Sequence, residues 1–218
     1  MSLRDRISVI RVSGDADREK GLEVLRATYG EEKHWVEDVS DQLPRADLER
    51  SDISWFVVLD ATRPVGVLRV LYDPPIELYA KYGFQLQDDS IDVEAFIRDH
   101  RIAEIGRFAV LPEYRKYIVV VAALMRAAST DTVERGYTHY ITDVFEGDPH
   151  SPYNFHTRVM GFQPVATHDI GELNFEGRRI TLVLDLKAAY NRLNSKGSWI
   201  FRYLTESWDE ALHRRMHA

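Results

Sequence analysis

The feature that most constrains the fold is an apolar run, IVVVAALMRAA at 118–128, that lies between two segments typical of β-strands. The run is apolar on nearly every side of a helix, which is typical of a helix buried in a core. The flanking segments, IAEIGRFAVL at 102–111 and YTHYITDVF at 137–145, are rich in β-branched and aromatic residues. We therefore predict a helix from near Tyr114 to about Arg135 that joins two parallel neighbouring strands through a right-handed crossover.

The other periodic segments predict antiparallel hairpins on both sides of this crossover. The order of elements is not the strict alternation of a doubly wound sheet. We expect an α/β (α+β) fold, with a mixed, mostly antiparallel central sheet, helices on both faces and an added C-terminal helix. The expected elements are a strand at 7–12, a helix from Asp15 or Asp17 to about Tyr29 that ends at Gly30, a hairpin of strands 55–59 and 65–72, irregular chain at 76–90, a helix capped by Asp92, and a closing hairpin of 162–167 and 179–186.

The C-terminal stretch carries an amphipathic stripe. Ile200, Leu204, Trp208 and Leu212 recur at every fourth position within a helix expected from 198 to 217. We predict a main domain over residues 1–190 and a helical extension over 191–218. The extension packs on the domain or on a second copy of the chain, in which case the protein is a homodimer.

Charge and cysteine content exclude several classes of function. The chain has 28 Lys and Arg residues against 35 Asp and Glu, a formal net charge of −7, which argues against a nucleic-acid partner. It has no cysteine, so disulfides, thiolate metal sites and cysteine nucleophiles are excluded. His150 and His156, with Asp143 or Asp148, match no strong spacing of metal ligands, and we expect no metal.

The longest apolar run without a charge, Ile118–Met125, is far too short to span a membrane. The N-terminal segment MSLRDRISVI is charged and is not followed by the apolar stretch of a secretion signal. We therefore expect a soluble, cytoplasmic protein.

Two segments carry a family resemblance, AEIGRFAVLPEYRK at 103–116 and HTRVMGF at 156–162. With the order of elements, they resemble the GNAT superfamily of N-acyltransferases, in which a strand ending in V-x-P-x-Y-R leads into a helix. Val110, Pro112, Tyr114 and Arg115 match that frame, and GF at 161–162 precedes the closing strands. Two features resemble the branch of N-acyl amino acid synthases and acyl-homoserine-lactone synthases. They are the phrase EIGRFAV and the insertion between the hairpin strand at 65–72 and this phrase.

The resemblance implies transfer of an acyl group from acyl-CoA to a primary amine. Acyl carrier protein is the alternative donor. In the family, backbone amides of the loop bind the coenzyme's pyrophosphate, and an amide near Val110 faces the thioester carbonyl. The family loop has glycines, R-x-x-G-x-G, whereas this chain has RKYIVV at 115–120. Free amides at a helix N-terminus and two basic side chains still favour an anion. The implied coenzyme-binding residues are Phe108, Ala109, Val110, Arg115, Lys116, Tyr117, Ile118, Val119 and Val120.

Glu104 is the candidate general base, because an amine must be neutral to attack a thioester and the strand matches one that carries a catalytic Glu in some members of the family. Strand alternation places Glu104, Gly106 and Phe108 on one face and Arg107 on the other. Arg107 is the candidate for holding a carboxylate of an amino acid acceptor. The alternatives are an ion pair with a basic neighbour for Glu104 and a structural salt bridge for Arg107.

The general acid for the departing thiolate is often a Tyr in the helix before GF, but the matching position here is Thr157. Tyr153 and His156 are the nearby candidates. The alternatives are that Tyr153 packs under the sheet and that His156 is exposed.

Three aromatic residues, Trp35, Tyr79 and Tyr82, either line a pocket or fill the core, and Trp35 is a candidate for substrate binding. The second reading of the whole chain is a GNAT-fold binding module without catalysis. The loop without glycine is its main support.

Overall fold

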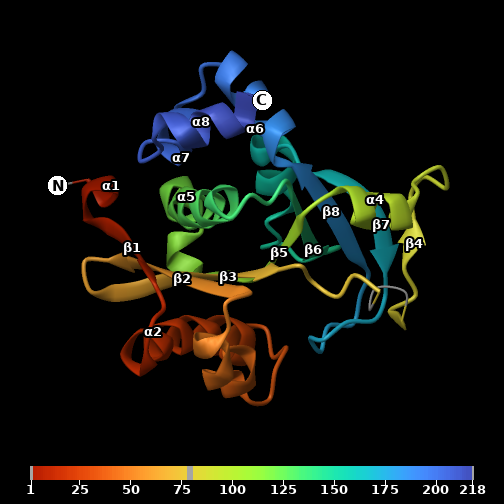
Figure 1. The fold of residues 1–218 in the computed structure, drawn as a ribbon. Helices are drawn as coiled ribbons and strands as arrows, with labels where there is room; N and C mark the ends of the chain where they lie inside the picture. The colour runs from red at the N-terminus through yellow and green to blue at the C-terminus, as the bar shows by residue number, and fades with distance from the viewer. Residues whose placement is uncertain (1, 78–80, 218) are drawn as a thin grey trace. The chain divides into compact units, whose positions relative to one another are not determined.

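The computed structural model describes residues 2–77 and 81–217, and its strands form one mixed sheet (Figure 1). Strands β5 and β6 pair in parallel, while β1–β2, β2–β3, β6–β8, β8–β7 and β7–β4 pair in antiparallel fashion. The strands in sheet order are β1 (Ile7–Arg11), β2 (Ile53–Asp60), β3 (Arg63–Tyr72), β5 (Ile102–Val110), β6 (His139–Phe145), β8 (Arg179–Asp185), β7 (Gln163–His168) and β4 (Gln85–Leu86).

The described helices differ in length and in type. The α-helices are α1 (Leu3–Arg6), α2 (Asp15–Leu25), α4 (Val93–Asp99), α5 (Ile118–Glu134), α6 (Leu186–Ser195), α7 (Trp199–Leu204) and α8 (Glu210–His217). Two segments are π-helical, η1 (Arg26–Glu32) and η5 (Phe155–Met160), and three are 3-10 turns, η2 (Val39–Gln42), η3 (Arg45–Glu49) and η4 (Pro112–Tyr114).

The chain divides into two compact units that are interleaved along the sequence. The first unit comprises Met1–Leu71, Ile105–Thr132 and Arg202–Ser207, and the second comprises Tyr72–Glu104, Val133–Phe201 and Trp208–Ala218. Strand β5 therefore begins in the second unit and ends in the first. The expected boundary at residue 190 stays a prediction.

In the first unit, α2 and α5 lie on opposite faces of the strands β1, β2 and β3 (Figure 1). The predicted helix after β5 is buried as expected, since Val120, Leu124 and Met125 are each 0% exposed. Gly66 on β3 permits the close approach of α5, because a Cβ there would lie 3.2 Å from Leu124 Cδ1 and 3.3 Å from the carbonyl oxygen of Ala109. The prediction of a buried crossover helix is confirmed.

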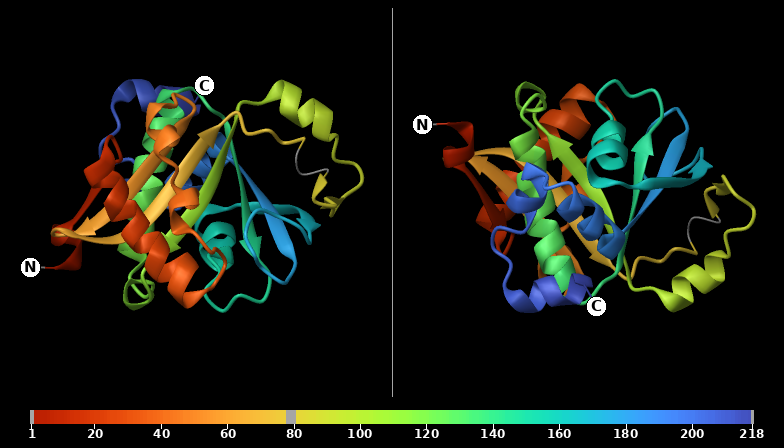
Figure 2. Two further views of the ribbon diagram at one scale, coloured as in Figure 1. Left: turned by 90° about the horizontal axis from the view of Figure 1, so that it is seen from below. Right: turned by 90° about the horizontal axis from the view of Figure 1, so that it is seen from above.

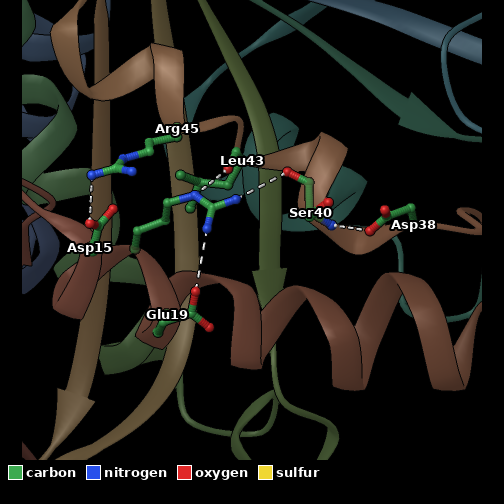
Figure 3. A network of polar contacts seen from close by, with 7 residues as sticks. Asp15, Glu19, Asp38, Ser40, Leu43 and Arg45 are labelled. Atoms are coloured by element: carbon green, nitrogen blue, oxygen red, sulfur yellow. Dashed lines mark hydrogen bonds and ion pairs between the residues drawn. The ribbon is translucent and has the colours of Figure 1, made fainter.

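The segment after η1 is fastened to α2 by a polar network (Figure 3). Arg18 on α2 donates from Nε to the carbonyl oxygen of Leu43 at 2.9 Å. The Leu43 side chain is fully buried on Gly21, where a Cβ would lie 2.8 Å from Leu43 Cδ1. Arg45 pairs with Asp15 at 2.9 Å. This segment therefore packs on α2 through buried and polar contacts.

In the second unit, β6, β8 and β7 form an antiparallel group (Figure 2). Ile102 and Ile141 form a small core on which Phe84 and Phe96 of the insertion pack. The predicted cap of α4 is confirmed, because the Asp92 side chain accepts a hydrogen bond from the amide of Ala95 at 2.9 Å.

The structure corrects several local predictions. Gly30 does not end the second helix, because the chain continues as a π-helix to Glu32. The segment expected to be irregular contains the short strand β4, which gains backbone hydrogen bonds from β7. The predicted C-terminal helix is two helices, since α7 ends at Leu204 and α8 begins at Glu210. Ile200, Leu204 and Leu212 of the stripe are nevertheless buried against their own chain.

Within residues 2–77 and 81–217, we find no helix that combines the length and the apolar character needed to cross a membrane.

Candidate active site

The C-terminal half of β5 departs from regular strand geometry. Its parallel register with β6 runs from Ile102 opposite His139 to Glu104 opposite Ile141. Arg107 then has a φ of 50°, in the left-handed region that side chains other than glycine rarely occupy. Such conformations cost about 1–3 kcal/mol and are concentrated at functional sites. The predicted alternation of faces is therefore wrong beyond this point, and residues 106–108 are all half-buried.

The loop between β5 and α5 is folded into tight turns. Tyr114 donates its amide to the Leu111 carbonyl at 2.9 Å, and the amides of Tyr117 and Val120 donate to the carbonyl oxygens three residues before them at 3.0 Å each. In the part of the chain that the structure describes, the amides at 116, 118 and 119 take no part in these turns. The first amides of a helix have no partner within it. They therefore offer donors at the positive end of α5.

The branched side chains that replace glycine in this loop point in different directions. Val120 is 0% exposed and packs in the core, whereas Ile118 is 42% exposed. Val120 therefore does not cover the loop, and its burial leaves the neighbouring amides available. Tyr117 is also exposed, and Lys116 Nζ lies 5.1 Å from the centre of its ring.

Arg115 is bound on three sides by its own chain. Its Nε donates to the carbonyl oxygen of Val110 at 3.0 Å, and its two terminal nitrogens donate to both carboxylate oxygens of Glu32, one of them at 2.6 Å. The two side chains are only 20% and 25% exposed. The charge of Arg115 is thus already matched. Glu32 is a residue that sequence reasoning missed, because it lies 83 positions away at the end of η1.

Residues 113 and 114 of the same loop belong to a second network of polar contacts. Tyr114 donates its hydroxyl to Asp60 at 2.9 Å, and Asp60 also accepts two hydrogen bonds from Arg6 at 2.7 and 2.8 Å. The Arg6 guanidinium, with help from Tyr114, lowers the pKa of Asp60. Arg63 pairs with Glu113 at 2.6 Å. The turn that carries the V-x-P-x-Y-R frame is therefore anchored to β2 and β3.

Trp35 belongs to the same unit as this loop. Its ring packs edge-on against Tyr29 at 5.1 Å and carries Lys33 Nζ at 5.0 Å from the ring centre. Tyr82 stacks on His168 at 5.8 Å in the second unit, and Tyr79 lies outside the described residues.

The candidate acids lie around η5 in the second unit. His156 is 1% exposed, so the alternative of an exposed side chain is wrong, and burial lowers its pKa to about 3. A neutral imidazole holds no acidic proton for a thiolate at neutral pH, and this argues against His156 as the acid. Tyr153 is half-buried, and its carbonyl oxygen accepts a hydrogen bond from Thr157 at 2.8 Å.

The sequence candidates therefore fall into two groups. The first unit contains Arg107, Trp35 and the loop from Phe108 to Val120, while the second contains Glu104, Tyr153 and His156. Among the residues that the structure describes, no three or more His, Cys, Asp or Glu side chains are grouped so that they could hold a metal ion.

Comparison with known proteins identifies the architecture. No family model and no curated protein matches the chain. Among solved structures, it is similar to FeeM, an N-acyl amino acid synthase from uncultured soil microbes, with a TM-score of 0.63 and 16% identity over 88% of this chain and 98% of that one. The chain has the GNAT fold. The predicted fold class, a mixed and mostly antiparallel sheet with helices on both faces, is confirmed.

Two further acetyltransferase structures agree with this result. A putative GNAT acetyltransferase from Desulfovibrio desulfuricans has a TM-score of 0.56 and 11% identity, over 83% of this chain and 99% of that one. Aminoglycoside 6'-acetyltransferase type Ii has a TM-score of 0.53 and 14% identity, over 81% and 97% of the two chains. At these identities, the likeness is one of fold.

Proposed function

We propose that this GNAT-fold chain is an N-acyltransferase that moves an acyl group from a thioester to a primary amine. The observation that carries the proposal is the loop after β5, where the amides of Lys116, Ile118 and Val119 stand at the N-terminus of α5 outside the loop's own hydrogen bonds. Such a helix terminus binds phosphate through N–H groups and its dipole. The fold and the V-x-P-x-Y-R frame support acyl-CoA as the donor.

The reaction is a direct attack. The amine nitrogen adds to the thioester carbonyl carbon, the C–S bond then breaks, and the sulfur leaves as a thiolate. In this proposal Glu104 accepts the proton that the amine loses, and the backbone near Val110 donates to the oxyanion. Tyr153 is the proposed donor of a proton to the thiolate, in preference to the buried and neutral His156.

The sharper proposal is a long-chain acyl donor and an amino acid-like acceptor. Arg107 would hold the acceptor's carboxylate by two parallel hydrogen bonds, and Trp35 would contact the substrate. The similarity of fold to an N-acyl amino acid synthase supports this reading. Acyl carrier protein is the alternative donor.

Native mass spectrometry tests the donor. The purified chain is titrated with CoA and with acyl-CoAs of increasing chain length, and we expect one coenzyme per chain, bound more tightly as the acyl chain grows. Ligand at 100 times its dissociation constant should also raise the stability by about 2.7 kcal/mol. If no CoA species binds, the proposed use of coenzyme A is wrong.

Turnover tests the chemistry. With acyl-CoA and a panel of amino acids, we expect release of CoA, and Glu104→Gln should lower kcat by a factor of about 10²–10⁴ without removing coenzyme binding. The loop without glycine favours one other function, a binding module without catalysis. Coenzyme binding with no turnover of any amine would support that reading instead.

A further inference from the structure

The charge of the proposed donor loop is controlled by a residue outside the loop. Arg115 is the arginine of the V-x-P-x-Y-R frame, yet both of its terminal nitrogens contact the carboxylate of Glu32. Its Nε is engaged by Val110. A planar guanidinium binds carboxylate and phosphate with the same forked geometry. Glu32 therefore occupies the same donors that a phosphate of a ligand would use.

Local backbone structure holds Glu32 in place. It ends the π-helix η1, whose last turn is followed by backbone hydrogen bonds from Lys33 to Thr28 at 2.9 Å and from Trp35 to Tyr29 at 2.8 Å. The side chains of Arg115 and Glu32 are 20% and 25% exposed, so water screens their attraction less than it would between fully exposed side chains. An incoming anion must either displace Glu32 from Arg115 or bind beside a carboxylate of its own sign.

We propose that Glu32 is a specificity-determining residue that weakens the binding of polyphosphate ligands at the donor loop by keeping Arg115 paired. This inference rests on the proposed function. With Arg115 paired, the loop binds an anion through backbone amides and Lys116. When Arg115 is released, it adds a full positive charge with two parallel donors next to those amides.

Calorimetric titration of the full chain with CoA tests this inference. Glu32→Gln keeps the size of the side chain and removes its charge, and we expect it to tighten CoA binding about tenfold. Pantetheine, which lacks phosphate, should bind both proteins equally. The matched control is Glu31→Gln, which removes the same charge from the exposed neighbouring position and should change the affinity less than twofold.

A second variant ties the effect to Arg115. In Glu32→Gln, where Arg115 is released, we expect log Kd for CoA to depend more steeply on log salt than in the unmodified chain. Adding Arg115→Met to this variant should remove both the gain in CoA affinity and the steeper salt dependence. Melting temperatures of all variants confirm that they are folded. If Glu32→Gln is the variant that fails to fold, Glu32→Ala and Glu32→Met are measured in the same way.

The outcomes separate this inference from the proposed function. Tighter CoA binding by Glu32→Gln alone supports the inference, including the case in which the unmodified chain binds too weakly to detect. If the unmodified chain binds CoA and Glu32→Gln binds it equally or more weakly, or Glu31→Gln tightens it as much, the inference is overturned while the proposed function stands. If neither protein binds CoA, the inference and the proposed use of coenzyme A are both overturned.

Discussion

The stability of the second unit should depend on pH through the ion pair made by one buried histidine. His168 on β7 is 2% exposed, and its Nδ1 lies 2.7 Å from the carbonyl oxygen of Ile170. Its Nε2 lies 3.1 Å from Oδ2 of Asp143. Both partners accept hydrogen bonds and neither donates, so the ring is best satisfied when both nitrogens carry protons. Burial lowers the pKa of His168, but the hydrogen bond and charge of Asp143 outweigh this, and the pKa is raised.

The substitution Asp143→Asn isolates this pair. Oδ1 of Asp143 accepts a hydrogen bond from Thr181 at 2.7 Å, and the amide oxygen of Asn can keep it. The amide nitrogen then replaces Oδ2 and donates to the neutral form of His168. Loss of a partner from a fully buried ion pair costs 3–5 kcal/mol, but the Asp143 side chain is 26% exposed. We therefore expect a loss of about 2 kcal/mol in mild acid, where the ion pair is formed.

The sign of the pH dependence follows from the raised pKa. A raised pKa in the folded state adds stability that is fully present below the unfolded value of about 6.5 and is lost as the pH rises through the folded value. In Asp143→Asn that contribution is absent, and burial opposes protonation. The stability difference between the two proteins should therefore be largest in mild acid and should shrink toward zero in mild base.

Urea unfolding at a series of pH values, followed by tryptophan fluorescence, measures this difference. Taking the difference cancels other titrating groups that the two proteins share. A difference that stays constant with pH would refute the assignment of a charged His168 to the folded state.

Two further substitutions test packing in each unit. Trp55 in the first unit donates Nε1 to Oδ2 of buried Asp47 at 3.0 Å, so Trp55→Phe should lower the free energy of unfolding by about 3 kcal/mol. Trp199 is exposed, and Trp199→Phe should change the free energy of unfolding by less than about 0.5 kcal/mol. Equal losses in the two variants would contradict the buried hydrogen bond. Gly161 in the second unit has a φ of 95°, and a Cβ there would lie 2.6 Å from Nη2 of Arg192. Gly161→Ala should therefore lower the free energy of unfolding, measured with denaturant, by about 1–3 kcal/mol. The control is Gly14→Ala, which should be tolerated because a Cβ there meets nothing within 4 Å.

Much of the fold could be predicted because it depends on patterns within one segment. The apolar run at 118–128 predicts the buried α5, and the strand-like runs before and after residues 60 and 170 predict both hairpins. Asp92 marks the start of α4 because its side chain caps the helix locally.

The features that sequence reasoning missed depend on distant partners. The strand β4 is only two residues long and exists because β7 pairs with it. The left-handed conformation of Arg107 has no marker such as glycine in the sequence. The pairing of Glu32 with Arg115 joins residues 83 positions apart, and in the sequence Glu32 stands in a polar stretch with no distinguishing spacing.

The interleaving of the two units affects how the chain can be made. The first unit takes its last segment, Arg202–Ser207, from close to the C-terminus. Within it, Arg126 pairs with Glu206 at 2.7 Å, and Arg4 and Arg126 lie 5.2 and 4.6 Å from the centre of the Tyr203 ring. Domains generally fold as units during synthesis, but here the segments 1–71 and 105–132 are separated from the last segment of their unit by most of the second unit. Completion of the first unit therefore requires that Arg202–Ser207 has been made, and a chain that stops before Arg202 lacks these contacts with α5.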